Sequence, residues 1–236
     1  MLANHDVKSE FATMPPRLLA VPAGRCFLGL PAHAAAGEAI WLQRALCQLL
    51  PRYEGILILL EEEHLGDDAG VDATVAAAGS PAVTAERATA LTMARWQEVD
   101  AVRRRLDRVD QVRVQLAAWS HFADASFVTL WRQLLTAFGV NTEFRNDVLR
   151  HWVSQQRVAS SREVTAQAAR VACLREIKSL AMRLRVGELS GHHAEYGRSP
   201  ESLLAVRLYA GSYAADGLTV EQLVGRPAKC VYRRLD

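Results

Sequence analysis

Two short apolar runs constrain the fold of this chain most. The first is CFLGL at 26–30 and the second is GILILLE at 55–61, and both are hydrophobic at nearly every position rather than at alternate positions. Strands with this pattern are buried on both faces, as in a parallel sheet covered by helices on each side. The segment between them, 36–50, repeats hydrophobic residues at helical spacing. The sequence therefore predicts a strand–helix–strand unit.

The rest of the chain continues this alternation, so we expect an α/β fold with a parallel sheet. Residues 1–22 are irregular, and no internal repeat or second domain is visible between 23 and 236. Gly, Ala and Asp dominate 64–83, which predicts a loop. The further predicted elements are helices at 84–108, 124–138, 141–157, from about 162 to 184, 199–210 and 219–224, a strand at 112–117 and a terminal strand at 230–236.

The amino-acid composition limits the class of protein and the cellular compartment that we expect. The 28 Lys and Arg residues exceed the 26 Asp and Glu residues by two, which excludes a grossly polybasic protein. The four cysteines are scattered, and most lie in apolar runs, so we expect buried free thiols in a reducing cytoplasm. The N-terminus lacks the apolar stretch of a signal peptide, and no run is long enough to span a membrane.

Ligands of open parallel sheets bind beyond the carboxyl ends of the strands. That rule gathers 29–34, 61–63 and the loop after Ala117 around one crevice. Gly29 is followed by no glycine before Gly37, so the phosphate-binding pattern G-x-G-x-x-G is absent, as are the Lys and Ser/Thr of a P-loop. Glu61 fits a ribose contact of a methyltransferase, but the glycine-rich turn is again missing. We expect no cofactor.

The remaining polar features divide into a weak metal candidate and a basic surface. His192 and His193 are adjacent and would point to different sides of an element, so we expect a polar loop there rather than a metal site. The helix at 84–108 is arginine-rich. Its clustered arginines form either a solvated helix face or a surface that follows RNA phosphates; they are Arg95, Arg103, Arg104, Arg105 and Arg108.

Taken together, residues 24–210 resemble the tRNA-dependent cyclodipeptide synthases. GLP at 29–31 stands where that family has a G-x-S turn, and Glu61 resembles the acidic residue that lines its second-substrate pocket. Glu176 resembles the glutamate of its Y-x-x-x-E motif, and Tyr196, twenty residues later, resembles a second family tyrosine. The arginine-rich helix resembles the helix that docks tRNA in the family. The stretch EYGRSPESLLAVRLY at 195–209 resembles its tyrosine-containing strand and the helix that follows.

The resemblance implies a single Rossmann-like domain, similar to the catalytic domain of class I aminoacyl-tRNA synthetases. It also implies two aminoacyl-tRNAs as substrates and a diketopiperazine, a natural product, as the result. The ATP-activating motifs H-I-G-H and K-M-S-K-S are absent here, which fits a substrate that arrives already activated as an ester.

Several family positions differ in this chain. The nucleophilic serine falls on Pro31, the catalytic tyrosine on Ala172, the asparagine after the serine on Ala34 and one subfamily's histidine on Gly197. Proline has neither a hydroxyl nor a backbone N–H, so Pro31 excludes a stored acyl-enzyme at that residue. Cys26 and His33 flank the turn as alternative nucleophiles.

We therefore expect direct transfer of an aminoacyl group from tRNA to an amine. The acceptor is either a second aminoacyl-tRNA or another small molecule, and we expect neither DNA nor membrane as a partner. Glu176 would act as general base and Tyr196 would orient the carbonyl. Phe27, Gly29, Pro31, Leu59 and Glu61 would contact the substrate, with Leu180 as a further wall residue. The alternative is a non-catalytic relative that binds aminoacyl-tRNA or RNA.

Overall fold

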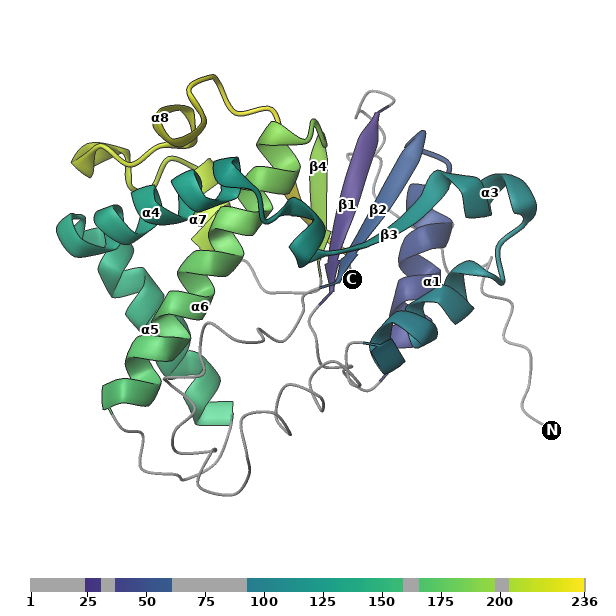
Figure 1. Ribbon diagram of the computed structural model, residues 1–236, viewed down its shortest axis with the longest axis horizontal. Coiled ribbons are helices and arrows are strands. Elements are labelled where there is room, and N and C mark those ends of the chain that lie inside the picture. The colour runs from purple at the N-terminus through teal and green to yellow at the C-terminus, as the bar shows by residue number, and fades with distance from the viewer. Residues whose placement is uncertain (1–23, 31–36, 61–92, 159–165, 198–203, 236) are drawn as a thin grey trace.

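A five-stranded sheet forms the centre of the molecule. The computed structural model describes residues 24–30, 37–60, 93–158, 166–197 and 204–235. The strands lie in the order β3-β2-β1-β4-β5, and every neighbouring pair is parallel (Figure 1). Their bounds are β1 (Arg25–Leu30), β2 (Gly55–Leu60), β3 (Val114–Ala118), β4 (Ala194–Gly197) and β5 (Val231–Arg234). The predicted α/β fold with a parallel sheet is confirmed.

Helices cover both faces of this sheet. On one face lie α1 (Glu38–Leu49) and a helix at 93–103, and on the other lies a bundle of α4, α5 and α6 (Figure 1). The remaining bounds are α3 (Arg108–Arg113), η5 (Trp119–Phe122), α4 (Ala125–Val140), α5 (Thr142–Val158), α6 (Ala166–Leu184), the π-helix η6 (Arg185–Leu189), α7 (Leu204–Tyr209), η7 (Ala214–Asp216) and α8 (Val220–Val224).

Each central strand contributes to two hydrophobic cores because its side chains alternate between the faces. Cys26, Leu28 and Leu30 of β1 pack with α1 and the helix at 93–103. Phe27 packs on the opposite side with Leu57 and Leu59 of β2, against α4 and α6. This double burial is the reason why the sequence shows continuous rather than alternating hydrophobic runs.

Short polar side chains fix where several helices begin. Asp124 accepts a hydrogen bond from the backbone N–H of Phe127 at 3.0 Å and caps α4. Asn141 does the same for α5 through Phe144, at 2.8 Å. Such caps satisfy backbone donors that have no partner inside the helix. The starts of α4 and α5 therefore lie within one residue of the predicted starts.

The long helix predicted at 84–108 is wrong at its C-terminal end. The helix at 93–103 stops, 104–107 form a turn, and α3 begins at Arg108. Asp107 caps α3 by accepting from the N–H of Asp110 at 2.8 Å. Gln111 stabilises the turn by donating its side-chain amide to the carbonyls of Arg104 and Leu106. The predicted segments 1–22 and 64–83, and the N-terminal part of this helix, lie outside the described residues.

The described residues contain no helix with both the length and the hydrophobicity needed to cross a bilayer. Three of the cysteines, Cys26, Cys173 and Cys230, are buried, and Cys47 is exposed. All four are free thiols. The expectation of free, mostly buried thiols is confirmed.

Candidate functional site

The carboxyl ends of β1 to β4 share one edge of the sheet, because these strands are parallel. Residues 31–36, 61–92 and 198–203, which follow β1, β2 and β4, lie outside the described residues. Pro31 and Glu61, two predicted substrate contacts, are among them. The described part of this edge consists of the last strand residues, η5 after β3, and the side of α6 that packs over the sheet.

At this edge Gly29 of β1 faces a buried ion pair. Arg183 of α6 binds the carboxylate of Glu195 of β4, and Glu195 is only 2 % exposed. A Cβ built on Gly29 would stand 3.7 and 3.8 Å from the guanidinium Nη1 and Nη2 of Arg183 and 3.8 Å from Oε1 of Glu195. No side chain therefore separates the β1 backbone from the two charges.

Glu176 lies on the same side of α6 as Arg183. Residues three, four and seven apart share one helix face, which groups Glu176, Ser179 and Arg183. Ser179 accepts a hydrogen bond from Nε of Arg183 at 3.4 Å, so these two side chains lie together on this face. α6 leads through η6 and a short turn into β4, so it runs antiparallel to the strand (Figure 1). Glu176 consequently lies two helical turns beyond Arg183 toward the carboxyl edge.

Apolar side chains surround this polar face. Phe27, Leu59 and Leu180 are all 0–1 % exposed and belong to the hydrophobic core between the sheet and α6. Trp119, the first residue after β3, extends this core toward the carboxyl edge. The structure thus places the predicted substrate contacts Phe27, Gly29 and Leu59 on the same sheet face as Glu195.

Tyr196 lies on the opposite face of the sheet from Gly29 and Glu176. It follows Glu195 in β4, and successive side chains of a strand alternate between faces. Tyr196 is 1 % exposed in the core under α1, where its hydroxyl lies 2.8 Å from the hydroxyl of Tyr53. Burial raises the pKa of both phenols. The structure does not bring Tyr196 to the predicted site, and its hydroxyl already has a partner.

Comparison with solved structures identifies the fold. A cyclo(L-leucyl-L-phenylalanyl) synthase superposes with a TM-score of 0.65 at 14 % identity, covering 92 % of each chain. A Mycobacterium tuberculosis protein, described as demonstrating that cyclodipeptide synthetases are related to type I tRNA synthetases, gives 0.63 at 14 % identity, covering 92 % of this chain and 87 % of that chain. A cyclodipeptide synthase of Candidatus Glomeribacter gigasporarum bound to Phe-tRNAPhe gives 0.52 at 12 % identity, over 92 % and 89 %.

The chain has the cyclodipeptide-synthase fold. At these identities the likeness establishes the fold alone. The sequence matches no protein-family model, and no curated protein sequence matches it. The predicted Rossmann-like fold, similar to that of class I tRNA synthetases, is confirmed.

Within the cyclodipeptide-synthase fold, the predicted arginines divide into structural and exposed residues. Arg95 is 6 % exposed and binds Glu38 of α1 at 2.6 Å. Its assignment to an RNA-binding surface is therefore wrong, because the guanidinium holds the helix at 93–103 against α1. Arg103 is partly buried and binds Asp100 at 2.8 Å and the Gln111 carbonyl at 3.2 Å.

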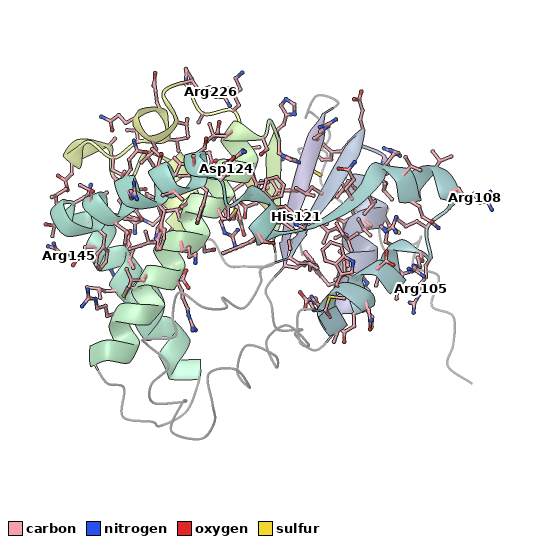
Figure 2. All side chains as sticks on the ribbon, viewed as in Figure 1. Arg105, Arg108, His121, Asp124, Arg145 and Arg226 are labelled. Carbon is pink, nitrogen blue, oxygen red and sulfur yellow. The ribbon has the colours of Figure 1, made fainter. Side chains whose placement is uncertain are left out.

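Arg104, Arg105 and Arg108 remain exposed. Arg104 also binds Asp100 at 2.6 Å, yet it is 74 % exposed. These three residues lie on the turn and on α3 instead of on one helix face, and Arg105 and Arg108 project from one end of the molecule (Figure 2).

The histidine pair takes part in backbone contacts. Nδ1 of His192 lies 3.0 Å from the carbonyl oxygen of Val186, and burial lowers the pKa of this histidine. His193 is exposed, and its Nδ1 accepts from the backbone N–H of Arg25 at 3.4 Å. Across the ranges that the structure describes, no group of three or more His, Cys, Asp or Glu side chains is arranged to hold a metal ion.

The sequence analysis does not assign Glu195 or Arg183 to the substrate site. The four-residue strand AEYG is too short to show a pattern of its own, so its face was unknown. The available signal was Gly29, because a glycine inside a buried strand often marks a close approach by another group. Cys26, an alternative nucleophile, belongs to the core on the α1 side, and burial raises the pKa of its thiol far above the usual range.

Proposed function

We propose that this protein transfers the aminoacyl group of an aminoacyl-tRNA to an amine acceptor and forms a peptide bond without ATP. The proposal is supported by the fold, shared over about nine tenths of the chain with cyclodipeptide synthases, one of which was solved bound to Phe-tRNA. The single observation that carries it is the placement of Glu176. Glu176 shares a helix face with Arg183, whose guanidinium lies against Gly29, and parallel sheets bind ligands at the carboxyl edge toward which this face extends.

The proposed chemistry is aminolysis of an ester. The acceptor nitrogen bonds to the carbonyl carbon of the aminoacyl group, and the bond from that carbon to the tRNA ribose oxygen breaks. Glu176 takes the proton from the attacking amine and returns it to the departing ribose oxygen. The ester is already activated, so holding both reactants in line can supply a large part of the barrier reduction, on the order of 7 kcal/mol.

Pro31 determines the order in which the substrates bind and react in this mechanism. With no serine at that position, the acyl group stays on tRNA until the acceptor attacks, so both substrates are bound at the same time. A second aminoacyl-tRNA as acceptor leads to a cyclic dipeptide after a second attack, and a small amine gives an aminoacylated product. Phe27, Gly29, Pro31, Leu59 and Glu61 are proposed to line the substrate site. Tyr196 has no role in this proposal because it lies on the other sheet face.

Turnover with charged tRNA tests the proposal directly. The protein is mixed with charged total tRNA, with and without a panel of small amines, and products are identified by mass spectrometry. We expect a cyclic dipeptide or an aminoacyl amide whose formation falls at least 100-fold in Glu176→Gln, since general bases contribute about that much. Glu221→Gln, which changes an exposed glutamate of α8, serves as the matched control and should keep full activity.

A second candidate function is a non-catalytic binder of aminoacyl-tRNA. Pro31 and Ala172 favour it, because they stand at the positions of the family's nucleophile and catalytic tyrosine. Tight binding of charged tRNA by wild-type protein, with no product from any amine or tRNA mixture, would establish the binder and exclude the transferase. Intact-protein mass spectrometry adds a further check, since a covalent aminoacyl adduct would contradict the direct mechanism.

A further inference from the structure

The Arg183–Glu195 ion pair is unusual because of its surroundings. It lies in the layer between the sheet and α6, which is otherwise built from apolar side chains such as Phe27, Leu59 and Leu180. A buried ion pair rarely stabilises a protein more than hydrophobic side chains of the same size would. Its position against the bare backbone of Gly29 points to a role in ligand recognition.

The two partners differ in what they offer a ligand. Glu195 is 2 % exposed and is held within the sheet, whereas Arg183 is 20 % exposed. Nη1 of Arg183 binds Glu195, and Nε donates to Ser179. In the part of the chain that the structure describes, Nη2 has no hydrogen-bond partner. A ligand group that approaches Gly29 therefore meets a guanidinium N–H of Arg183. The positive charge of this guanidinium is already neutralised by the carboxylate of Glu195.

We infer that Arg183 selects which amino acid the bound tRNA carries. It favours amino acids whose side chains end in a carbonyl or carboxylate oxygen. This inference rests on the proposed function, and the preferred residues are Gln, Asn, Glu and Asp. Their terminal oxygen accepts from Nη2, while an apolar side chain such as leucine leaves that donor desolvated and unpaired. A site built around a hydrogen bond rejects analogues that lack it far more strongly than an apolar site rejects a changed shape.

Binding measurements test this selection apart from turnover. The probes are one tRNA body carrying glutamine, glutamate or leucine through a stable 3′-amide, and the same tRNA uncharged. We expect wild-type protein to bind the glutamine or glutamate form at least tenfold more tightly than the leucine form. In Arg183→Met the difference should shrink to about twofold. Stronger binding of the glutamine form identifies a carboxamide ligand, and stronger binding of the glutamate form identifies a carboxylate.

Two further variants keep the test interpretable. Arg183→Met leaves the Glu195 carboxylate without its cation, so Arg183→Met/Glu195→Gln is measured beside it and should lose the same preference. Arg185→Met is the matched control: Arg185 is 17 % exposed, follows α6 directly and pairs with Asp124 instead. It should keep the wild-type preference.

Three results would overturn the inference. They are equal or tighter binding of the leucine form by wild-type protein, an unchanged preference in both Arg183 variants, and an equal loss for all three charged tRNAs in those variants. The proposed function fails by a different result, the absence of product in the transfer assay, and the binding ratios still decide the inference in that case.

Discussion

Tyr53 and Tyr196 share a hydrogen bond at the centre of the core beneath α1. Both rings are 1 % exposed, and their hydroxyls, 2.8 Å apart, have one another as partner. The rings also meet edge to face, with centroids 5.8 Å apart. This buried hydroxyl pair joins β4 to the turn between α1 and β2, so its role is structural.

Removing one of these hydroxyls should therefore cost stability and spare function. In Tyr196→Phe the Tyr53 hydroxyl stays buried without its partner, which should lower the free energy of unfolding by about 1–3 kcal/mol. The double variant Tyr53→Phe/Tyr196→Phe should lose less than the sum of the two single changes. Urea unfolding of the four proteins measures this. A large loss of transfer activity in Tyr196→Phe, with stability unchanged, would return the residue to the active site.

Tyr196 also illustrates which features of a single residue can be predicted from the sequence alone. The family resemblance predicted that Tyr196 lies in a strand, which the structure confirms, but the sheet face to which a strand residue points changes with every residue. Phe27, Gly29 and Leu59 belong to long apolar strands whose common edge follows from parallel topology, so their proximity was predictable. The meeting of Arg183 with Glu195 depends on how α6 packs over β4, and that packing leaves no mark in the local pattern.

At the scale of elements, one carboxylate joins the start of α4 to the end of α6. Asp124 caps α4 and also binds Arg185, the first residue of η6, at 2.6 Å. The hydrogen bonds from Arg185, together with that from the Phe127 N–H, lower the pKa of Asp124 to about 2. The contact fixes the π-helical turn through which the chain leaves α6 for β4.

The lowered pKa of Asp124 predicts the direction in which the stability of the protein changes with pH. Asp124 has a lower pKa folded than unfolded, so its contribution is present above about pH 4 and is lost as the pH falls toward 2. Asp124→Asn keeps a helix-capping side chain but removes the charge. The Tm of wild-type protein should exceed that of Asp124→Asn at pH 6, and the gap should close between pH 4 and 2. A gap that does not vary with pH would exclude the ion pair as its cause.

Helices and strands with long periodic patterns were predicted well, and the misses have local causes. The helix predicted to run to 108 carries arginines that favour helix, but the Asp107 cap and the Gln111 side chain stop it at 103 and start α3. β4 was foreseen only through the family resemblance. Its four residues are placed by pairing with β1 and β5, an interaction between segments far apart in sequence.

At the scale of the whole molecule, exposed arginines follow one another closely on the turn at 104–107 and at the start of α3, although the net charge is only +2. Arg104, Arg105 and Arg108 are exposed, and Figure 2 shows Arg105 and Arg108 at the end of the molecule opposite Arg145. Nearby Val109 and Val112 of α3 are 71 % and 79 % exposed, so this end also offers apolar contact area. We propose this end as the tRNA-binding surface.

Salt dependence distinguishes this surface from a merely solvated one. The triple change of Arg104, Arg105 and Arg108 to Gln should weaken tRNA binding and make the plot of log K against log salt shallower by about 1 for each arginine that contacts a phosphate. Arg145→Gln, at the opposite end, should leave the slope unchanged. Filter binding between 50 and 300 mM KCl measures both. Identical slopes for the triple variant and wild-type protein would place the tRNA elsewhere.

The ion pair beneath Gly29 also bears on how the protein acquires its site during folding. Arg183 of α6 and Glu195 of β4 are separated only by η6 and a short turn, so closing the chain between them costs little entropy, whereas β1 pairs with β4 across most of the polypeptide. The two charges proposed to contact a substrate thus belong to neighbouring parts of the chain, α6 and β4. Pairing of β4 with β1 joins Phe27 to Glu195 in register, and this long-range contact is what brings Gly29 beside the two charges.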